Sequence, residues 1–129
     1  MILKDSLVIW CQYEYHAKTM RIPLRIQEYL NKRKPVLYCP SSKDSISDSF
    51  LFSGVELILS SGGIVMQDRN FQQRRLVERL RDLKVNSVEI CGAIVNTCLD
   101  RLKKNLDSKG FIAEINMDHS ITISEMFGV

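Results

Sequence analysis

Residues 87–99, SVEICGAIVNTCL, lead from a short apolar run through a glycine towards the start of a helix. The run at 87–91 has the length and composition of a buried strand, and Gly92 is expected to end it. Asn96 belongs to the residue types that cap helices, so a helix is expected to begin there. A strand followed at once by a helix is the repeating unit of α/β proteins.

The rest of the chain continues this alternation of strand-like and helical patterns. The expected strands are residues 6–11, 36–39, 64–66 and 111–115, and the expected helices are residues 22–31 and 71–83. Residues 50–59 fit either a helix or irregular structure, and the polar residues 41–49 fit a surface loop. Such alternation implies parallel strands joined by crossovers. The sequence therefore predicts one α/β domain over residues 1–129, a three-layer Rossmann-like fold with a parallel sheet of about five strands flanked by helices.

Composition and charge narrow the classes of function. The chain has 129 residues, a hydrophobic fraction of 45% and a net charge of +3, which is too weakly basic to indicate a nucleic-acid partner. The arginines of the second expected helix are interpreted as a solvated face. No run is long and apolar enough to span a bilayer, and the N-terminus lacks a signal-peptide pattern. We therefore expect a cytoplasmic protein with no nucleic-acid or membrane partner. The arginines in question are Arg74, Arg75, Arg79 and Arg81.

The cysteines give no sign of a metal site. Cys11, Cys39, Cys91 and Cys98 form no Cys-x-x-Cys pair, so they are expected to be free thiols. No phosphate-binding glycine motif occurs either. We therefore expect no metal and no cofactor, and a plain nucleotide-binding module has little support.

Cys98 has two interpretations. In the first turn of a helix, the dipole and the unpaired N–H groups favour the thiolate, which is the nucleophilic form of cysteine. Backbone amides around Val95 and Cys98 could also face a developing oxyanion. Alternatively, Cys98 is a core residue, because it shares a helical stripe with Leu102 and Leu106.

The segment 91–99, CGAIVNTCL, resembles the strand-to-helix segment of the isochorismatase-like cysteine hydrolases, which include nicotinamidases and related amidohydrolases. In that family the nucleophile follows the strand-ending glycine by six residues, as Cys98 follows Gly92. The opening run 7–12, LVIWCQ, is similar to the family's first strand, and residues 54–80 are similar to the stretch that precedes the cysteine segment. The resemblance implies the fold above and Cys98 as the catalytic cysteine.

The family's catalytic set is incomplete in this sequence. The family also uses an aspartate base in the first strand and a lysine near the end of the third. Trp10 stands where the aspartate is expected, and Gln67 stands nearest the expected lysine. The histidines of metal-binding members have no counterpart in residues 41–49. The resemblance thus implies a shortened member with a degenerate triad. Three charged residues could substitute, although each is expected to be an ordinary surface charge: Glu14, Asp68 and Arg69.

Ligands of open α/β sheets bind outside the carboxyl ends of the strands. The binding residues predicted there are Trp10, Gln12, Gln67, Gly92 and Val95. Trp10 either fills the former pocket or forms an aromatic wall for a planar ligand. The missing base and lysine favour a non-catalytic domain that binds a small molecule or a protein partner.

The alternative is a divergent cysteine hydrolase of the amidohydrolase class with Cys98 as nucleophile. A homo-oligomer is also expected, with apolar residues of the segment 50–59 as its surface.

Overall fold

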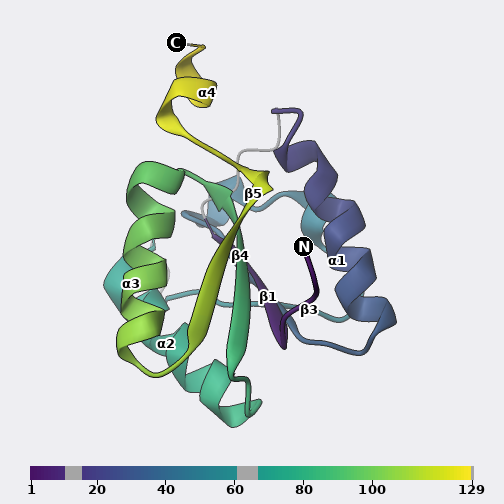
Figure 1. The fold of residues 1–129 in the computed structure, drawn as a ribbon, viewed down its shortest axis with the longest axis vertical. Helices are drawn as coiled ribbons and strands as arrows, with labels where there is room; N and C mark the ends of the chain where they lie inside the picture. The colour runs from purple at the N-terminus through teal and green to yellow at the C-terminus, as the bar shows by residue number, and fades with distance from the viewer. Residues whose placement is uncertain (11–15, 61–66, 129) are drawn as a thin grey trace.

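The computed structural model describes residues 1–10, 16–60 and 67–128. In these residues five strands form one sheet in the order β3-β2-β1-β4-β5, and every neighbouring pair is parallel (Figure 1). The predicted parallel sheet is confirmed. The strands are β1 (Ser6–Trp10), β2 (Val36–Cys39), β3 (Val55–Leu57), β4 (Ser87–Ala93) and β5 (Ile112–Ile121).

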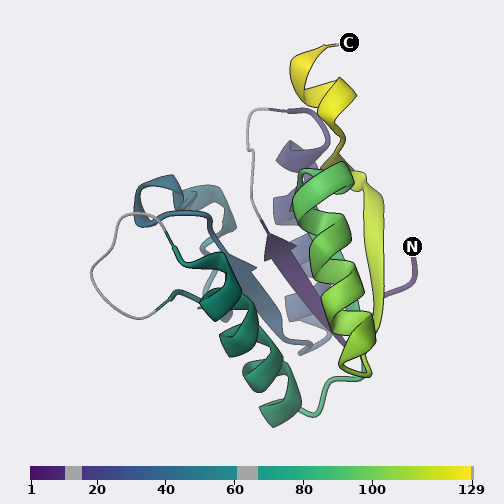
Figure 2. The same cartoon turned by 90° about the vertical axis from the view of Figure 1, so that its left-hand side faces the viewer.

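Helices cover both faces of this sheet, which gives the three layers expected from the sequence. α1 lies on one face, whereas α2 and α3 lie side by side on the other (Figures 1 and 2). The short α4 extends beyond the end of β5. No helix in the described part of the chain is long and apolar enough to cross a membrane. The helices are α1 (Ile22–Asn31), α2 (Arg69–Asp82), α3 (Asp100–Ser108) and α4 (Ile123–Phe127).

The central strand β1 divides the core between the two faces. Leu7 and Ile9 pack with α1, whereas Val8 and Trp10 pack with α2 and α3. Successive side chains of a strand point to opposite faces, and a parallel strand covered on both sides is apolar throughout. The run SLVIW in β1 is therefore fully buried.

Local signals set the bounds of several elements as expected. α1 and β2 match their predicted ranges, and Pro23 lies in the first turn of α1. α2 begins at Arg69, two residues earlier than expected, because the Asp68 carboxylate accepts a hydrogen bond from Phe71 N at 3.1 Å and caps the helix. Gly110 follows α3 with φ of +94°, as a helix-ending glycine should.

The strands require three corrections. The predicted strand 64–66 lies outside the described residues. The third strand of the chain is β3, so the expectation of helix or irregular structure over residues 50–59 is wrong for residues 55–57. β3 is a three-residue edge strand, too short for a clear pattern. β4 does not end at Gly92 but continues to Ala93, and β5 continues to Ile121 rather than Ile115. Pairing between these two strands extends both, with a bulge at Ile90/Gly92.

Candidate functional site

At the carboxyl edge of the sheet, the predicted binding residue Trp10 lies between residues of the two neighbouring strands. Trp10 is in register with Cys39 of β2 on one side and with Gly92 of β4 on the other. This is the edge at which open α/β sheets bind ligands. Trp10 is 1% exposed and belongs to the core cluster on the α2 and α3 face. The indole ring therefore occupies interior space at this edge.

Arg69, at the start of α2, covers the Trp10 ring. Its guanidinium carbon lies 3.7 Å from the ring centroid, a cation–π contact. Its Nη1 donates hydrogen bonds to Pro40 O at 2.8 Å and to Gln72 Oε1 at 2.5 Å. The expectation that Arg69 is an ordinary surface charge is wrong, because these bonds hold the side chain over the end of β1 and β2.

Gln72 completes this arrangement and was missed by sequence reasoning. Its side chain is fully buried, and its Nε2 donates to Pro40 O at 3.0 Å and to Ile58 O at 2.7 Å. Gln72 therefore ties α2 to the chain after β2 and β3. The signal was present, since Gln72 stands one turn before Leu76 on the apolar stripe of α2. A buried glutamine needs hydrogen-bond partners, and the two carbonyls supply them.

Gln67 is turned inward and 6% exposed. Its Oε1 accepts hydrogen bonds from the backbone N–H and the hydroxyl of Ser60, and its own N–H donates to Ser41 O at 3.2 Å. Its Nε2 is buried and has no hydrogen-bond partner among the residues that the structure describes. These bonds join Gln67 to Ser60 and Ser41. A ligand-binding role for Gln67 stays a prediction, and the predicted Gln12 and the candidate Glu14 lie outside the described residues.

Gly92 is required by the close approach of β4 to β1. Its φ is +133°, and a Cβ atom there would overlap the carbonyl oxygen of Trp10. Only glycine adopts such a conformation readily and leaves the space free. Gly92 thus sets the register of the edge; whether it also contacts a ligand stays a prediction.

Cys98 lies in a π-helical turn, Val95–Leu99, that precedes α3. The prediction that Asn96 caps this helix is wrong. The N-cap is Ile94 and has no side-chain cap, whereas Asn96 Oδ1 accepts a hydrogen bond from Ile123 N at 3.1 Å and so holds α4. The Ala93–Ile94 peptide bond before the turn is cis.

The Cys98 side chain is partly buried and packs, like Val95, against the core cluster that contains Trp10. This packing is compatible with the core interpretation, and the role of Cys98 as a nucleophile stays a prediction. The sulfur also accepts a hydrogen bond from Thr97 Oγ1 at 3.8 Å. Cys98 and Trp10 therefore lie on the same face of the sheet, whereas Asp68 is engaged as the cap of α2.

A buried acid on the opposite face was also missed from the sequence. Glu89 of β4 is 0% exposed and receives two bonds from Arg25, from Nη2 at 2.6 Å and from Nε at 2.7 Å. Tyr29 and Asn116 donate to the same carboxylate at 2.8 and 2.9 Å. Burial raises the pKa of Glu89, but the hydrogen bonds and charge of its partners outweigh burial and leave the pKa below its ordinary value. This network fastens α1 to the sheet.

The described residues contain no group of three or more His, Cys, Asp or Glu side chains that could hold a metal ion. The donor set in that part of the chain therefore does not fit a zinc site, which needs three or four such ligands.

An all-parallel five-stranded sheet flanked by helices, with a strand-to-helix turn that carries a cysteine, is the arrangement of the isochorismatase-like fold. The comparisons with solved structures show this fold. The pyrazinamidase of Pyrococcus horikoshii in complex with zinc superposes with a TM-score of 0.74 and 13% identity, over 92% of this chain and 87% of that chain.

Two other amidases have the same arrangement. N-carbamoylsarcosine amidase from Thermoplasma acidophilum gives a TM-score of 0.68 at 13% identity, over 97% of this chain and 90% of that chain. The nicotinamidase of Staphylococcus aureus gives a TM-score of 0.66 at 12% identity, over 96% of this chain and 89% of that chain. No protein-family model and no curated protein sequence matches the chain.

Proposed function

We propose that this chain is a non-catalytic isochorismatase-like domain that binds a small molecule or a protein partner. The observation that carries the proposal is Trp10. It stands where the resemblance places the catalytic aspartate, it is 1% exposed, and Arg69 lies across its ring. The position expected for the catalytic base is therefore occupied by the Trp10 ring, which the Arg69 guanidinium covers.

The chemistry of tryptophan supports this reading. A cysteine hydrolase needs a group that takes the proton of the thiol and later gives it to the leaving group. The indole Nε1–H is a donor only and has no basic lone pair. Trp10 cannot act as that base. The guanidinium of Arg69 has N–H donors and no acceptor, so it cannot act as one either.

The proposal also includes a localisation and an oligomeric state. We place it in the cytoplasm, because its cysteines form no pattern typical of a disulfide-linked or metal-binding protein. We also propose a homo-oligomer. In the 50–59 segment, Leu51 and Leu57 are exposed, while Phe50 is buried. A monomeric mass in solution would reject self-association.

The alternative function is a divergent amidohydrolase with Cys98 as nucleophile. The observation that favours it is the contrast among the cysteines: Cys98 is partly exposed, whereas Cys39 and Cys91 are fully buried. The substrates to consider are the amides in the names of the similar enzymes, nicotinamide, pyrazinamide and N-carbamoylsarcosine.

Alkylation of the folded protein by iodoacetamide across a pH series, read for each cysteine by mass spectrometry, separates the two functions. Burial raises the pKa values of Cys39 and Cys91, so these two thiols serve as unreactive internal controls. The proposed function predicts that Cys98 reacts as an ordinary thiol with a pKa of about 8.5. Rapid reaction of Cys98 well below that pH would identify an activated nucleophile and favour the alternative.

A further inference from the structure

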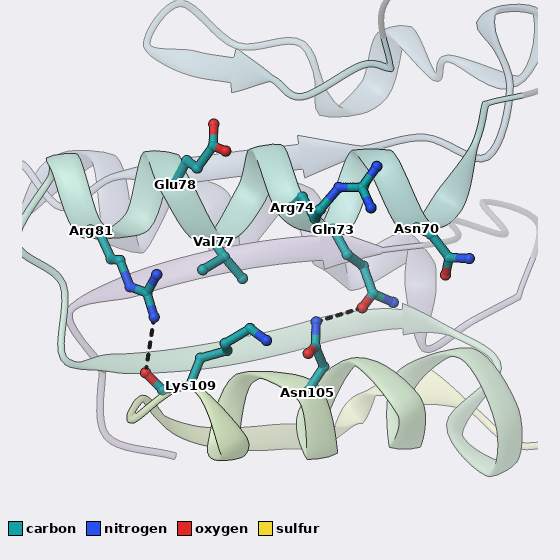
Figure 3. A pocket seen from close by; sticks show the side chains of 8 residues that line it. All are labelled: Asn70, Gln73, Arg74, Val77, Glu78, Arg81, Asn105 and Lys109. Carbon is teal, nitrogen blue, oxygen red and sulfur yellow. Dashed lines mark hydrogen bonds between the residues drawn. The ribbon is translucent and has the colours of Figure 1, made fainter.

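A groove runs along α2, from Asn70 near its start to Arg81 near its end, and Asn105 and Lys109 from the C-terminal part of α3 line its other side (Figure 3). Its volume is about 410 Å³, within the size range of small-molecule sites. The side chains that matter for its chemistry are Gln73, Arg74, Glu78, Arg81, Asn105 and Lys109.

The groove carries a surplus of positive charge. Arg74, Arg81 and Lys109 line it together with a single carboxylate, Glu78. In the described part of the chain, no ion pair joins these three cations to a carboxylate. Arg79, from the same arginine series, behaves differently, because it pairs with Glu56 at 2.8 Å. The series is thus not one uniform solvated face: two of its members face the groove.

Arg81 and Lys109 both line the groove, and the Lys109 backbone lies beside the Arg81 guanidinium. Arg81 Nη2 approaches the carbonyl oxygen of Lys109 at 3.5 Å, which holds the guanidinium beside the end of α3. Figure 3 shows the Lys109 side chain running along α3 towards Asn105, while Glu78 is directed away from α3. Helix C-termini stabilise cations, which accounts for the placement of Arg81 and Lys109. Arg74, in the middle of α2, has its guanidinium carbon 5.4 Å from the centroid of the Phe71 ring.

Amide side chains form the middle of the groove. Asn105 Nδ2 donates to Gln73 Oε1 at 2.7 Å and so bridges the two helices (Figure 3). Among the described residues, the amide nitrogen of Gln73 makes no hydrogen bond, so its N–H groups are available to a ligand. Arg74 and Arg81 are seven residues apart on α2, a rise of about 10 Å. The groove therefore offers donors along its length.

We propose that this groove binds a small molecule that carries a phosphate group. Arg81 and Lys109 hold the phosphate, Gln73 donates to the part of the ligand beside it, and Arg74 faces its far end. A guanidinium presents a planar fork of N–H donors that matches phosphate oxygens. A phosphate monoester carries a charge of about −1.5 to −2 at neutral pH, which matches the surplus of cations. The inference rests on the proposed binding function and names its site and ligand class.

The test is a nuclear magnetic resonance titration of the folded chain with inorganic pyrophosphate, adenosine monophosphate and succinate. The matched variants are Arg81→Gln with Lys109→Gln in the groove, and Lys32→Gln with Arg101→Gln on exposed surface elsewhere. Both pairs remove the same charge, so general screening affects them equally.

We expect saturable shifts at Arg81, Lys109 and Gln73 with the two phosphate compounds. Affinity should fall by about tenfold or more in the groove variant, because charge-assisted bonds are lost, and stay unchanged in the control variant. Shifts that do not saturate, or equal losses in both variants, would overturn the inference. Succinate binding as tightly as pyrophosphate would overturn the phosphate class. A separate titration in which an RNA oligonucleotide binds, although adenosine monophosphate does not, would also overturn the small-molecule class.

The outcomes also separate this inference from the proposed function. Amide turnover that depends on Cys98 would defeat the non-catalytic proposal while leaving phosphate binding in the groove intact. If the chain turned over no amide and bound no pyrophosphate, only the inference about the groove would fail.

Discussion

Arg69 lies over the ring of Trp10, with its guanidinium carbon 3.7 Å from the ring centroid, and the two residues come from α2 and β1. The same arginine binds the Pro40 carbonyl after β2. Arg69 therefore joins α2 to β1 and to the chain after β2, at the edge where open α/β sheets bind ligands. The Trp10 ring is thus part of a packed and hydrogen-bonded arrangement.

Trp10 is the single tryptophan of the chain, so its fluorescence reports whether the Arg69 guanidinium covers the ring. We expect Arg69→Ala to shift the emission to longer wavelength and to increase quenching by acrylamide, because the ring loses its covering guanidinium. Loss of the contact should lower the free energy of unfolding by about 1–2 kcal/mol. Arg75→Ala, an exposed change on the same helix, is the matched control and should leave emission and quenching unchanged. Equal spectra for wild type and Arg69→Ala would show that the ring is not covered in solution.

Removal of the buried acid should destabilise the fold strongly. Glu89→Ala leaves Arg25 buried with no carboxylate on its inner side, and breaking a buried ion pair costs about 3–5 kcal/mol. Glu28→Gln is the matched control, since Glu28 pairs with the same arginine from the solvent side and is mostly exposed. Its loss should cost no more than about 1 kcal/mol. Urea unfolding of both variants measures the difference, and similar losses in the two would contradict the assigned network.

The same acid predicts a pH dependence of stability. The pKa of Glu89 in the folded protein lies below its ordinary value of 4.5, so the unfolded chain binds the proton more readily. The stabilisation is present above that ordinary value and is lost as pH falls through the folded pKa. Urea unfolding midpoints measured from neutral to acidic pH should therefore fall below about pH 4.5. Glu89→Gln should reduce this slope, and an unchanged slope would count against the pKa shift.

Glycine at position 92 should be indispensable. Gly92→Ala places a Cβ atom against the Trp10 carbonyl and forces an L-residue to a φ of +133°. Strain of this kind costs about 1–3 kcal/mol before the backbone overlap is added. Gly110→Ala is the control, because its φ is also positive but its Cβ would meet no atom within 4 Å. We expect a much larger loss of stability, by urea or thermal unfolding, at position 92. Equal losses at both positions would contradict the close approach of β4 and β1.

The local pattern of the sequence is enough to predict a parallel sheet and α1, but not β3. Pro23, Gly110 and the buried run of β1 act within a few residues of where they stand. The content of the site depends on partners far away in the chain. Glu89 pairs with Arg25 across 64 positions, and Asn96 bonds Ile123 across 27. A local pattern shows that a buried acid needs a partner but cannot say which residue supplies it.

The same limit explains Arg69 and Cys98. Position and charge alone make Arg69 a surface residue, because only the fold brings it over Trp10. The spacing from Gly92 placed Cys98 correctly after the strand, but the wrong cap was assigned because the Asn96 side chain is used by α4 instead.

The most direct test of the central claim is ammonia release from nicotinamide, pyrazinamide and N-carbamoylsarcosine by the wild-type chain and by Cys98→Ala. A chain with Trp10 in place of a base is predicted to release no more ammonia than buffer, and the variant should be indistinguishable from wild type. Turnover by the wild type that disappears in Cys98→Ala would contradict the account and establish a cysteine hydrolase.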